Sequence, residues 1–380
     1  MSFEDDVNEL NRQYFFREFT YSQTTFRPVP TTQLELADSF IWLDDSAIAF
    51  QIKERSIDGS TSPELEEEWF ASKVVKLATK QVRDTLLYLD QHSPIDLVNR
   101  RGHKRSLHRS SIKTLHKVVC YEPAPELPDR CKNKRFHISS TAGVIHLMAS
   151  ADYIGVVRTL LTPAEVMDYF DFRERLIVAR RDDVGTFPEQ AILGQFLKDG
   201  NADIKPSLEH ANLWRNIKHD SDRWDISGIL EKFADRIIDQ SPSEEYYPIL
   251  VELAKLKRNE LSEFKLRFML TRENAVRSVP QSYRMYCHRT GCAFVFVSVP
   301  IELKDKKVNA LQNFTIGGKY SLRAHKSVGV CICPDTDGYF LADWCFVEAP
   351  WEQEPLLDEW LKNSPFPEVR EVELKRYDFE

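Results

Sequence analysis

The chain has 380 residues, of which 42% are hydrophobic and 29% charged, and its formal net charge is −8. This length exceeds what a single hydrophobic core supports, and the apolar content excludes a disordered chain, so we expect two globular domains. The negative charge excludes a protein that is basic over its whole surface, although it allows a local basic groove.

Turn residues and apolar periodicity predict a mixed α/β domain in the first third of the chain. The Asp44-Asp45-Ser46 turn lies between two segments rich in residues that favour strands, which indicates a β-hairpin. Apolar residues at helical spacing indicate a helix on each side of this hairpin. In chain order, the predicted elements are a helix at Glu4–Phe19, strands at Gln33–Leu43 and Ala47–Lys53, a helix at Glu64–Gln91 and a strand at Leu115–Tyr121.

The sequence predicts a domain boundary within residues 182–206, which are rich in glycine and polar residues. The α/β domain then spans residues 1–181, and a second domain of α+β class spans residues 207–380 because its predicted helices are followed by strands. The first domain is predicted to end with a strand at Gly143–Met148 and helices at Ser150–Leu161 and Pro163–Ala179, the last capped by Thr162. The second is predicted to contain helices near 208–240, 244–273 and 351–362 and strands at Tyr283–Cys287, Cys292–Val299, Val328–Cys333 and Tyr339–Val347.

Three polar side chains of the predicted hairpin point to metal-assisted chemistry. By the two-residue period of a strand, Asp38 falls within an apolar stripe, where a carboxylate without a partner is unfavourable. Gln51 and Lys53 share one face of the second strand. Hydrolysis of a phosphodiester needs oxygen ligands for a hard cation and a positive group near the developing negative charge. Asp38 and the weaker ligand Gln51 can supply the oxygens, and Lys53 can supply the charge.

A resemblance to the PD-(D/E)XK nuclease superfamily lies in the segment Asp38-Ser-Phe-Ile-Trp-Leu-Asp-Asp-Ser-Ala-Ile-Ala-Phe-Gln51-Ile-Lys53. That superfamily carries an acid on one strand and an acid-x-lysine on the next, and this chain is similar to the branch in which glutamine replaces the second acid, as in methylation-dependent restriction enzymes. The resemblance covers the N-terminal third. It implies a restriction-endonuclease-like fold, Mg²⁺ or Mn²⁺ as cofactor, DNA as substrate and a role in bacterial defence.

The resemblance also implies two further residues at the site. Related nucleases place a glutamine of the long helix beside the metal, and Gln81 is a polar residue on the predicted apolar face of that helix. A core-edge glutamine bonded to the backbone is an equally common explanation of such a position. Superfamily members also often add an acid from the first helix as a metal ligand, for which we prefer Glu18 over Glu9.

Two groups of basic residues are candidates for contacts with the DNA backbone. One lies on the long helix and comprises Lys73, Lys76 and Lys80; the other lies in the acid-free stretch from Asn99 to Lys117 and includes Arg100, Arg101, Lys104 and Arg105. A solvated helix side and an exposed loop are the alternatives for these two groups.

Other motifs do not indicate a site. The spacings of Cys287 with Cys292 and of Cys331 with Cys333 differ from common zinc sites, so we expect buried cysteines in strands. We interpret Gly317-Gly318-Lys319 as a turn because the strand and the spaced first glycine of a phosphate loop are missing. His137 and His146 lack the partners of a catalytic set and are expected to be structural.

The cellular setting follows from the cysteines and the hydropathy. Seven cysteines and no apolar N-terminal signal segment lead us to expect reduced thiols in a cytoplasmic protein, and the longest apolar stretch, Ala293–Ile301, is too short to span a membrane.

The leading hypothesis is a metal-dependent DNA endonuclease whose second half supplies recognition, oligomer contacts, binding of a partner subunit or regulation. The first alternative is a nuclease-like module that binds nucleic acid or protein without cutting, because Gln51 leaves the site one charge short. The second is a purely structural protein in which Asp38 starts a turn and Gln51 and Lys53 lie on a solvated face.

Overall fold

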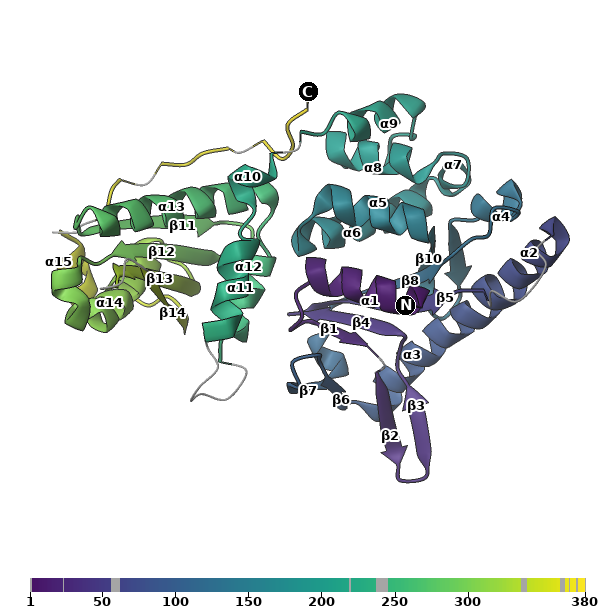
Figure 1. The fold of residues 1–380 in the computed structure, drawn as a ribbon, viewed down its shortest axis with the longest axis horizontal. Coiled ribbons are helices and arrows are strands. Elements are labelled where there is room, and N and C mark those ends of the chain that lie inside the picture. The colour runs from purple at the N-terminus through teal and green to yellow at the C-terminus, as the bar shows by residue number, and fades with distance from the viewer. Residues whose placement is uncertain are drawn as a thin grey trace. The chain divides into compact units, whose positions relative to one another are not determined.

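The computed structural model describes the whole chain except residues 1, 23, 56–61, 219, 237–244, 336–339, 363–365, 369, 374 and 380. The chain forms two compact units, Met1–Lys218 with Tyr377–Glu380 and His219–Arg376 (Figure 1). The first unit therefore continues beyond residue 181, where the predicted domain ends. It does so because α8 (Glu189–Lys198) and α9 (Leu208–Arg215) belong to it, and Phe196 of α8 is buried in the main core.

A six-stranded mixed sheet forms the centre of the first unit, which confirms the predicted α/β class. Its strand order is β1-β4-β5-β8-β10-β9. β5, β8 and β10 pair in parallel, whereas β4 pairs antiparallel with both β1 and β5, and β9 pairs antiparallel with β10. The bounds are β1 (Thr20–Ser22), β4 (Ser39–Leu43), β5 (Ser46–Lys53), β8 (Thr114–Tyr121), β9 (Phe136–Ser139) and β10 (Gly143–Ala149).

Helices cover both faces of this sheet. Side chains of β8 alternate between two cores, so that Val118 lies in the core on one face and Val119 in the core on the other. The first face carries α1 (Phe3–Tyr14), α5 (Ser150–Leu160), α6 (Pro163–Ala179) and α8; the second carries a continuous helical run of α2 (Pro63–Trp69), η1 (Phe70–Ala78) and α3 (Thr79–His92). Shorter helices are η2 (Arg109–Ser111), α4 (Asp129–Lys132) and α7 (Arg181–Val184).

The caps of α6 match the sequence prediction. The helix spans Pro163–Ala179, and the Thr162 hydroxyl accepts a hydrogen bond from the Glu165 amide at 3.2 Å. Proline in the first turn costs no hydrogen bond there, since the first amides of a helix have no partner within it. The start of this helix is therefore fixed locally by its own sequence.

The long second helix contains a π-helical segment that was not predicted. η1 spans Phe70–Ala78, and its wider turn changes which residues face the sheet. Val74 and Ala78 are buried, whereas Leu77 is 39% exposed. An unbroken α-helix would place Leu77 on one apolar face with Val74 and Gln81, and that expectation is wrong because the 3.6-residue period does not hold across this segment.

Two small two-stranded sheets stand beside the main sheet. β2 (Thr25–Val29) pairs with β3 (Thr32–Glu35), and β6 (Ile95–Val98) pairs with β7 (Lys104–Leu107). The predicted continuous strand from Gln33 to Leu43 is thus wrong, because the chain leaves β3 and turns before β4 begins. The turn is held by the Leu36 amide, which donates to the Thr24 carbonyl at 2.8 Å, and by the Ala37 carbonyl, which accepts from the Thr24 hydroxyl at 2.6 Å.

The segment after residue 376 returns to the first unit. The Lys218 amide donates to the Asp378 carbonyl at 2.9 Å, and Ile217 forms an antiparallel bridge with Phe379. Tyr377 is buried in the main core with its ring centroid 6.4 Å from that of Phe196. The second unit is therefore an insertion whose two ends enter and leave the first unit at one place.

The second unit contains a four-stranded sheet with the order β11-β12-β13-β14. β12 and β13 are parallel, and the two outer pairings are antiparallel. The four strands lie where they were predicted: β11 (Gln281–Cys287), β12 (Cys292–Ser298), β13 (Lys326–Pro334) and β14 (Phe340–Glu348). The helices are α10 (Ser221–Trp224), α11 (Ser227–Arg236), α12 (Tyr247–Ala254), α13 (Arg258–Val276), η3 (Ile301–Lys306), α14 (Lys307–Ser321) and α15 (Pro355–Lys362), while residues 237–244 of the predicted helices lie outside the described part.

The predicted turn at Gly317-Gly318-Lys319 is wrong, because these residues lie within α14. A Cβ atom on Gly317 would come within 2.2 Å of the Trp360 ring, and one on Gly318 within 2.5 Å of a Val295 methyl group. The glycines therefore permit close packing of this helix on α15 and β12.

The cysteines agree with the prediction of free thiols. None of the seven forms a disulfide, and Cys287, Cys292, Cys331 and Cys333 are buried in strands. No helix in the described part of the chain has the length and apolar character needed to cross a bilayer.

Candidate functional site

Asp38 lies immediately before β4, where the hairpin brings it against the end of β5. Its amide donates to the Phe50 carbonyl at 3.1 Å. Its Oδ2 atom accepts hydrogen bonds from the Ile52 amide at 2.5 Å and from the Lys53 Nζ atom at 3.0 Å. Asp38 is only 8% exposed, so these two donors stabilise a carboxylate that is largely removed from water. The structure therefore brings Asp38 and Lys53 together, as the side-chain alternation predicts.

Gln51 lies on the same face of the hairpin as Asp38 and Lys53. Ser39 is paired with Phe50 in the antiparallel register, so the next position places residue 38 opposite residue 51. Gln51 is 4% exposed, and within the described chain its Oε1 atom has no hydrogen-bond partner. A buried carbonyl oxygen without a donor is uncommon in folded proteins. It is free to accept a bond from a cation or a water molecule.

Gln81 of α3 carries a second buried side-chain oxygen. Its Oε1 atom also has no hydrogen-bond partner among the residues that the structure describes. One turn further along, the Thr85 hydroxyl donates to the Leu36 carbonyl at 2.5 Å, which fixes α3 against the chain just before Asp38. A helical turn rises about 5.4 Å, so Gln81 is held close to this segment.

Two acids that the sequence analysis did not select, Glu4 and Glu35, lie in the electrostatic field of Asp38. Burial raises the pKa of Glu4, and the nearby negative charges of Asp38 and Glu35 raise it further. Burial and Asp38 likewise raise the pKa of Glu35, while Lys53 acts to lower it. Glu4 is one of three consecutive acids in the first turn of α1, where the helix dipole favours them, so its sequence context offered no distinguishing signal.

The acids preferred from the sequence, Glu18 and Glu9, are engaged elsewhere. The Glu18 carboxylate forms an ion pair with Arg101, and the Glu9 carboxylate forms ion pairs with Arg12 at 3.0 Å and with Arg100 at 2.7 Å. The hydrogen bond from Arg12 lowers the pKa of Glu9. The predicted helix Glu4–Phe19 is too long, because α1 ends at Tyr14 and Glu18 lies beyond it; within α1, Glu4 fits the site better than Glu9.

The basic stretch after Asn99 is an ordered hairpin rather than an exposed loop. Beyond the two arginines already named, Lys104 pairs with Asp96 at 2.7 Å, and the Arg105 guanidinium lies 4.3 Å from the centre of the Trp42 ring. Much of its charge is thus neutralised within the fold. Its value for binding phosphate is correspondingly smaller than the sequence suggests.

The lysines of the long helical run differ from this hairpin. Lys73, Lys76 and Lys80 are all exposed, and Lys80 pairs with Asp84 at 3.3 Å. The described structure records no ion pair for the other two. Lys73 and Lys76 are therefore the better candidates for a phosphate contact.

A second polar cluster lies on the opposite face of the main sheet. One ligand atom from each of His116, His146 and Glu174 lies within 4.8 Å of the others. The Nδ1 atom of His116 is 3.8 Å from the Glu174 carboxylate, and its Nε2 atom is 3.5 Å from Asp171. Burial lowers the pKa of His146 well below its usual value, and the neighbouring Arg173 acts in the same direction.

The three side chains lie close enough together to bind one metal ion, but their hydrogen bonding does not match that of a metal site. Arg173 donates to the Nδ1 atom of His146 at 2.7 Å. Because a guanidinium only donates, a neutral His146 carries its proton on Nε2, the atom that would have to bind the ion. Histidines that bind metals instead donate from their second nitrogen to an acceptor. The three groups are therefore closer to a buried proton network than to a metal centre.

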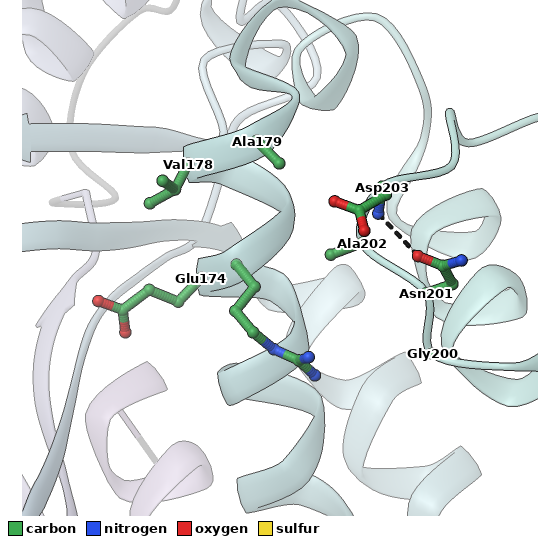
Figure 2. A pocket seen from close by; sticks show the side chains of 8 residues that line it. Glu174, Val178, Ala179, Gly200, Asn201, Ala202 and Asp203 are labelled. Carbon is green, nitrogen blue, oxygen red and sulfur yellow. Dashed lines mark hydrogen bonds between the residues drawn. The ribbon is translucent and has the colours of Figure 1, made fainter.

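Glu174 also lines a pocket of about 440 Å³ between α6 and the segment 200–203. Figure 2 shows its carboxylate on the other side of α6 from Asn201 and Asp203. The Asn201 side chain accepts a hydrogen bond from the Asp203 amide at 2.9 Å, so it braces its own loop.

No family model, no curated protein and no solved structure matches this chain.

Proposed function

We propose that the first unit is a metal-dependent nuclease that hydrolyses phosphodiester bonds in DNA. One observation carries the proposal: the Asp38 carboxylate and the Lys53 ammonium group meet at 3.0 Å beside the buried, unpartnered Oε1 atom of Gln51. An acid, an amide oxygen and a positive charge thus converge from two adjacent strands, an arrangement suited to a hard cation and an anionic substrate.

Each of the three side chains has a distinct role in this proposal. Asp38 and Gln51 supply oxygen ligands to Mg²⁺ or Mn²⁺, and Asp38 retains an Oδ1 atom for which the described structure records no hydrogen bond. The bound cation makes a water molecule more acidic and stabilises negative charge on the phosphate. Lys53 places its charge beside the scissile phosphate, where charge develops as the bond to the leaving oxygen breaks.

Glu4 and Glu35 supply the negative charge that Gln51 lacks. Burial raises the pKa of each carboxyl group, and the nearby negative charge of Asp38 raises it further. A divalent ion would remove this repulsion, so the unfavourable cluster of acids favours binding of a cation. We assign Glu4 to the role that the resemblance gives to a first-helix acid.

The test uses supercoiled plasmid DNA with Mg²⁺, with Mn²⁺ and with a chelator. We expect cleavage by the wild-type protein in the presence of either ion, and loss of at least roughly 100-fold of the rate in Asp38→Asn and Lys53→Ala. Arg175→Ala is the matched control because it removes an exposed positive charge from α6, on the other face of the sheet. Equal rates in all four proteins would contradict the proposal.

A direct measurement of metal binding separates the nuclease from a non-cutting relative of the same fold. Titration with Mn²⁺ followed by calorimetry should give one heat signal that Asp38→Asn abolishes and Lys53→Ala preserves. DNA binding without cleavage and without a Mn²⁺ signal would favour a nucleic-acid-binding module, in which Lys53 simply neutralises Asp38. Absence of both DNA binding and cleavage would contradict either role.

A further inference from the structure

The β2–β3 ribbon projects beyond the body of the first unit (Figure 1). Its last residue, Glu35, is followed after two residues by Asp38, so the ribbon and the candidate site belong to one continuous segment. Its base is rigid, because the Thr24 side chain and the Thr85 hydroxyl bind the backbone of residues 36 and 37. A structure anchored in this way keeps a fixed direction relative to Asp38.

The two faces of the ribbon differ in character. Phe26 faces the protein and packs on Tyr88 and His92 of α3, with ring centroids 5.8 and 5.7 Å apart. Arg27 and Gln33 are exposed, and the Arg27 Nη2 atom donates to the Gln33 Oε1 atom at 3.4 Å. The inner face therefore fixes the ribbon, and the outer face presents two polar side chains side by side.

The outer face is the one that looks toward the candidate site. Thr25 pairs with Glu35, and one step further along the ribbon Phe26 pairs with Leu34. By the two-residue period, Gln33 lies on the same face as Glu35, roughly 7 Å further out. The register shifts between Phe26 and Val29, so the position of Arg27 rests instead on its hydrogen bond to Gln33. Besides burial, the charges of Asp38 and Lys53 both act on the pKa of Glu35. A substrate that lies across Asp38 therefore continues along Arg27 and Gln33.

The composition of the ribbon suits an anionic partner that carries hydrogen-bonding edges. Between Thr25 and Glu35 the ribbon carries one basic residue, Arg27, and one acid, Glu35 at its base, so residues 25–34 contain no aspartate or glutamate. Arginine and glutamine are the side chains that form paired hydrogen bonds to guanine and to adenine in the major groove. Pro28 and Pro30 lack amide hydrogens, which makes the ribbon a poor edge for addition of a strand from another protein.

The size of the ribbon also fits a DNA groove. β2 has five residues and so extends roughly 17 Å. The major groove of B-DNA is about 12 Å wide and 8.5 Å deep, and it admits a two-stranded ribbon. The major groove of double-stranded RNA is too narrow for side chains to read.

We propose that the β2–β3 ribbon enters the major groove of duplex DNA bound at Asp38, and that Arg27 and Gln33 contact base edges there. This inference rests on the proposed nuclease function, because Asp38 sets where the duplex lies. The ribbon thereby gives the enzyme a sequence preference within a few base pairs of the cleaved bond.

The test is carried out on the full chain with the Asp38→Asn substitution, so that DNA is bound without being cut. A pool of duplexes with random sequence is incubated with the protein, and the bound fraction is sequenced. We expect enrichment of particular base pairs, with discrimination of roughly 5- to 150-fold for each base contact. Adding Arg27→Ala and Gln33→Ala should remove that enrichment, whereas adding Arg175→Ala should preserve it.

Arg27→Lys distinguishes a base contact from a phosphate contact. Lysine keeps the charge but loses the two-pronged geometry of arginine, so affinity should hold while the preference at one position weakens. An unchanged preference in the double alanine variant, or no preference in any protein, would overturn the ribbon proposal. The proposal would also be overturned if the double alanine variant lost binding to double-stranded RNA but kept its binding to duplex DNA. Plasmid cleavage by the wild-type protein would show in either case that the nuclease proposal still stands.

Discussion

The two faces of the main sheet hold different kinds of buried polar group. On the face covered by α6, Arg173 is fully buried and donates to the Glu189 carboxylate at 2.7 and 3.1 Å and to His146. On the face covered by α3, the side-chain oxygens of Gln51 and Gln81 have no donor within the described chain. Buried atoms without a hydrogen-bond partner occur on the first face as well, at both ring nitrogens of His116 and at Nε2 of His146, so the faces differ in the chemistry of these atoms: ring nitrogens on one and amide oxygens on the other.

The pKa values of Glu189 and Glu4 are shifted in opposite directions. Burial acts to raise the pKa of Glu189, but Arg173 overcomes this effect and holds the pKa below its usual value. Burial and the Asp38 charge instead raise the pKa of Glu4. Pairing thus stabilises the charged form of Glu189, whereas Glu4 and Glu35 lie near like charges.

The largest effect is expected from breaking the network on the α6 face. Glu189→Gln leaves the fully buried guanidinium of Arg173 without its counter-charge, and removing one partner of a buried pair costs about 3–5 kcal/mol. Urea unfolding should show this loss in the free energy of unfolding. Arg175→Ala, on the exposed side of the same helix, should change stability by no more than about 0.5 kcal/mol. Similar values for the two variants would remove the contrast between the faces.

Asp38→Asn should separate activity from stability on the other face. The amide oxygen can still accept the hydrogen bond from the Ile52 amide, so we expect a change of less than about 1.5 kcal/mol in the free energy of unfolding. Cleavage should nevertheless fall by at least roughly 100-fold. A large loss of stability with a proportionate loss of activity would instead make Asp38 a structural residue.

Gln51→Met tests whether the unpartnered oxygen is unfavourable in the metal-free protein. Methionine has a similar shape and removes the buried oxygen, so the metal-free variant should be more stable than the wild-type protein by about 1 kcal/mol. Saturating Mn²⁺ should raise the melting temperature of the wild-type protein and not that of the variant. If the substitution destabilises the protein with and without the ion, Gln51 is bonded within the fold.

The pH dependence of stability is expected to be the smallest of these effects, but its direction follows unambiguously from the pKa shifts of Glu4 and Glu35. Because Glu4 and Glu35 have raised pKa values, these two groups bind more protons in the folded protein than in the unfolded chain, and their contribution to stability falls as the pH rises above about 4.5. The double variant Glu4→Gln, Glu35→Gln should lack this component. Its stability relative to the wild-type protein should therefore increase from pH 4.5 upward and level off above the folded pKa values. An increase in the relative stability of the wild-type protein over that range would contradict the assignment.

The hairpin and its three polar residues could be predicted because they depend on local rules. Asp38, Gln51 and Lys53 lie on adjacent strands joined by a short turn, so strand alternation alone determines which side chains meet. The start of α6 could also be predicted, because Thr162 caps the helix and Pro163 lies in its first turn. Elements of this kind are set by residues close in sequence.

The parts that could not be predicted depend on contacts distant in sequence or on local geometry without a sequence signature. Glu4 lies in the field of Asp38 only because α1 packs across the sheet. Arg100 and Arg101 form ion pairs with Glu9 and Glu18, which reduces the positive charge that they offer to a ligand. The π-helical segment at Phe70–Ala78 follows no propensity that distinguishes it from an α-helix. For the second unit, finally, no residue of the sequence indicates a particular chemical function.

The insertion of the second unit has a consequence for biosynthesis. Tyr377 completes the main core of the first unit, and Asp378 and Phe379 hold the strand-like segment at Ile217. A ribosome must therefore translate the whole of the inserted unit before the first unit can close around its core. During that interval the nascent first unit lacks part of its final packing, which delays its full assembly until the intervening unit has emerged.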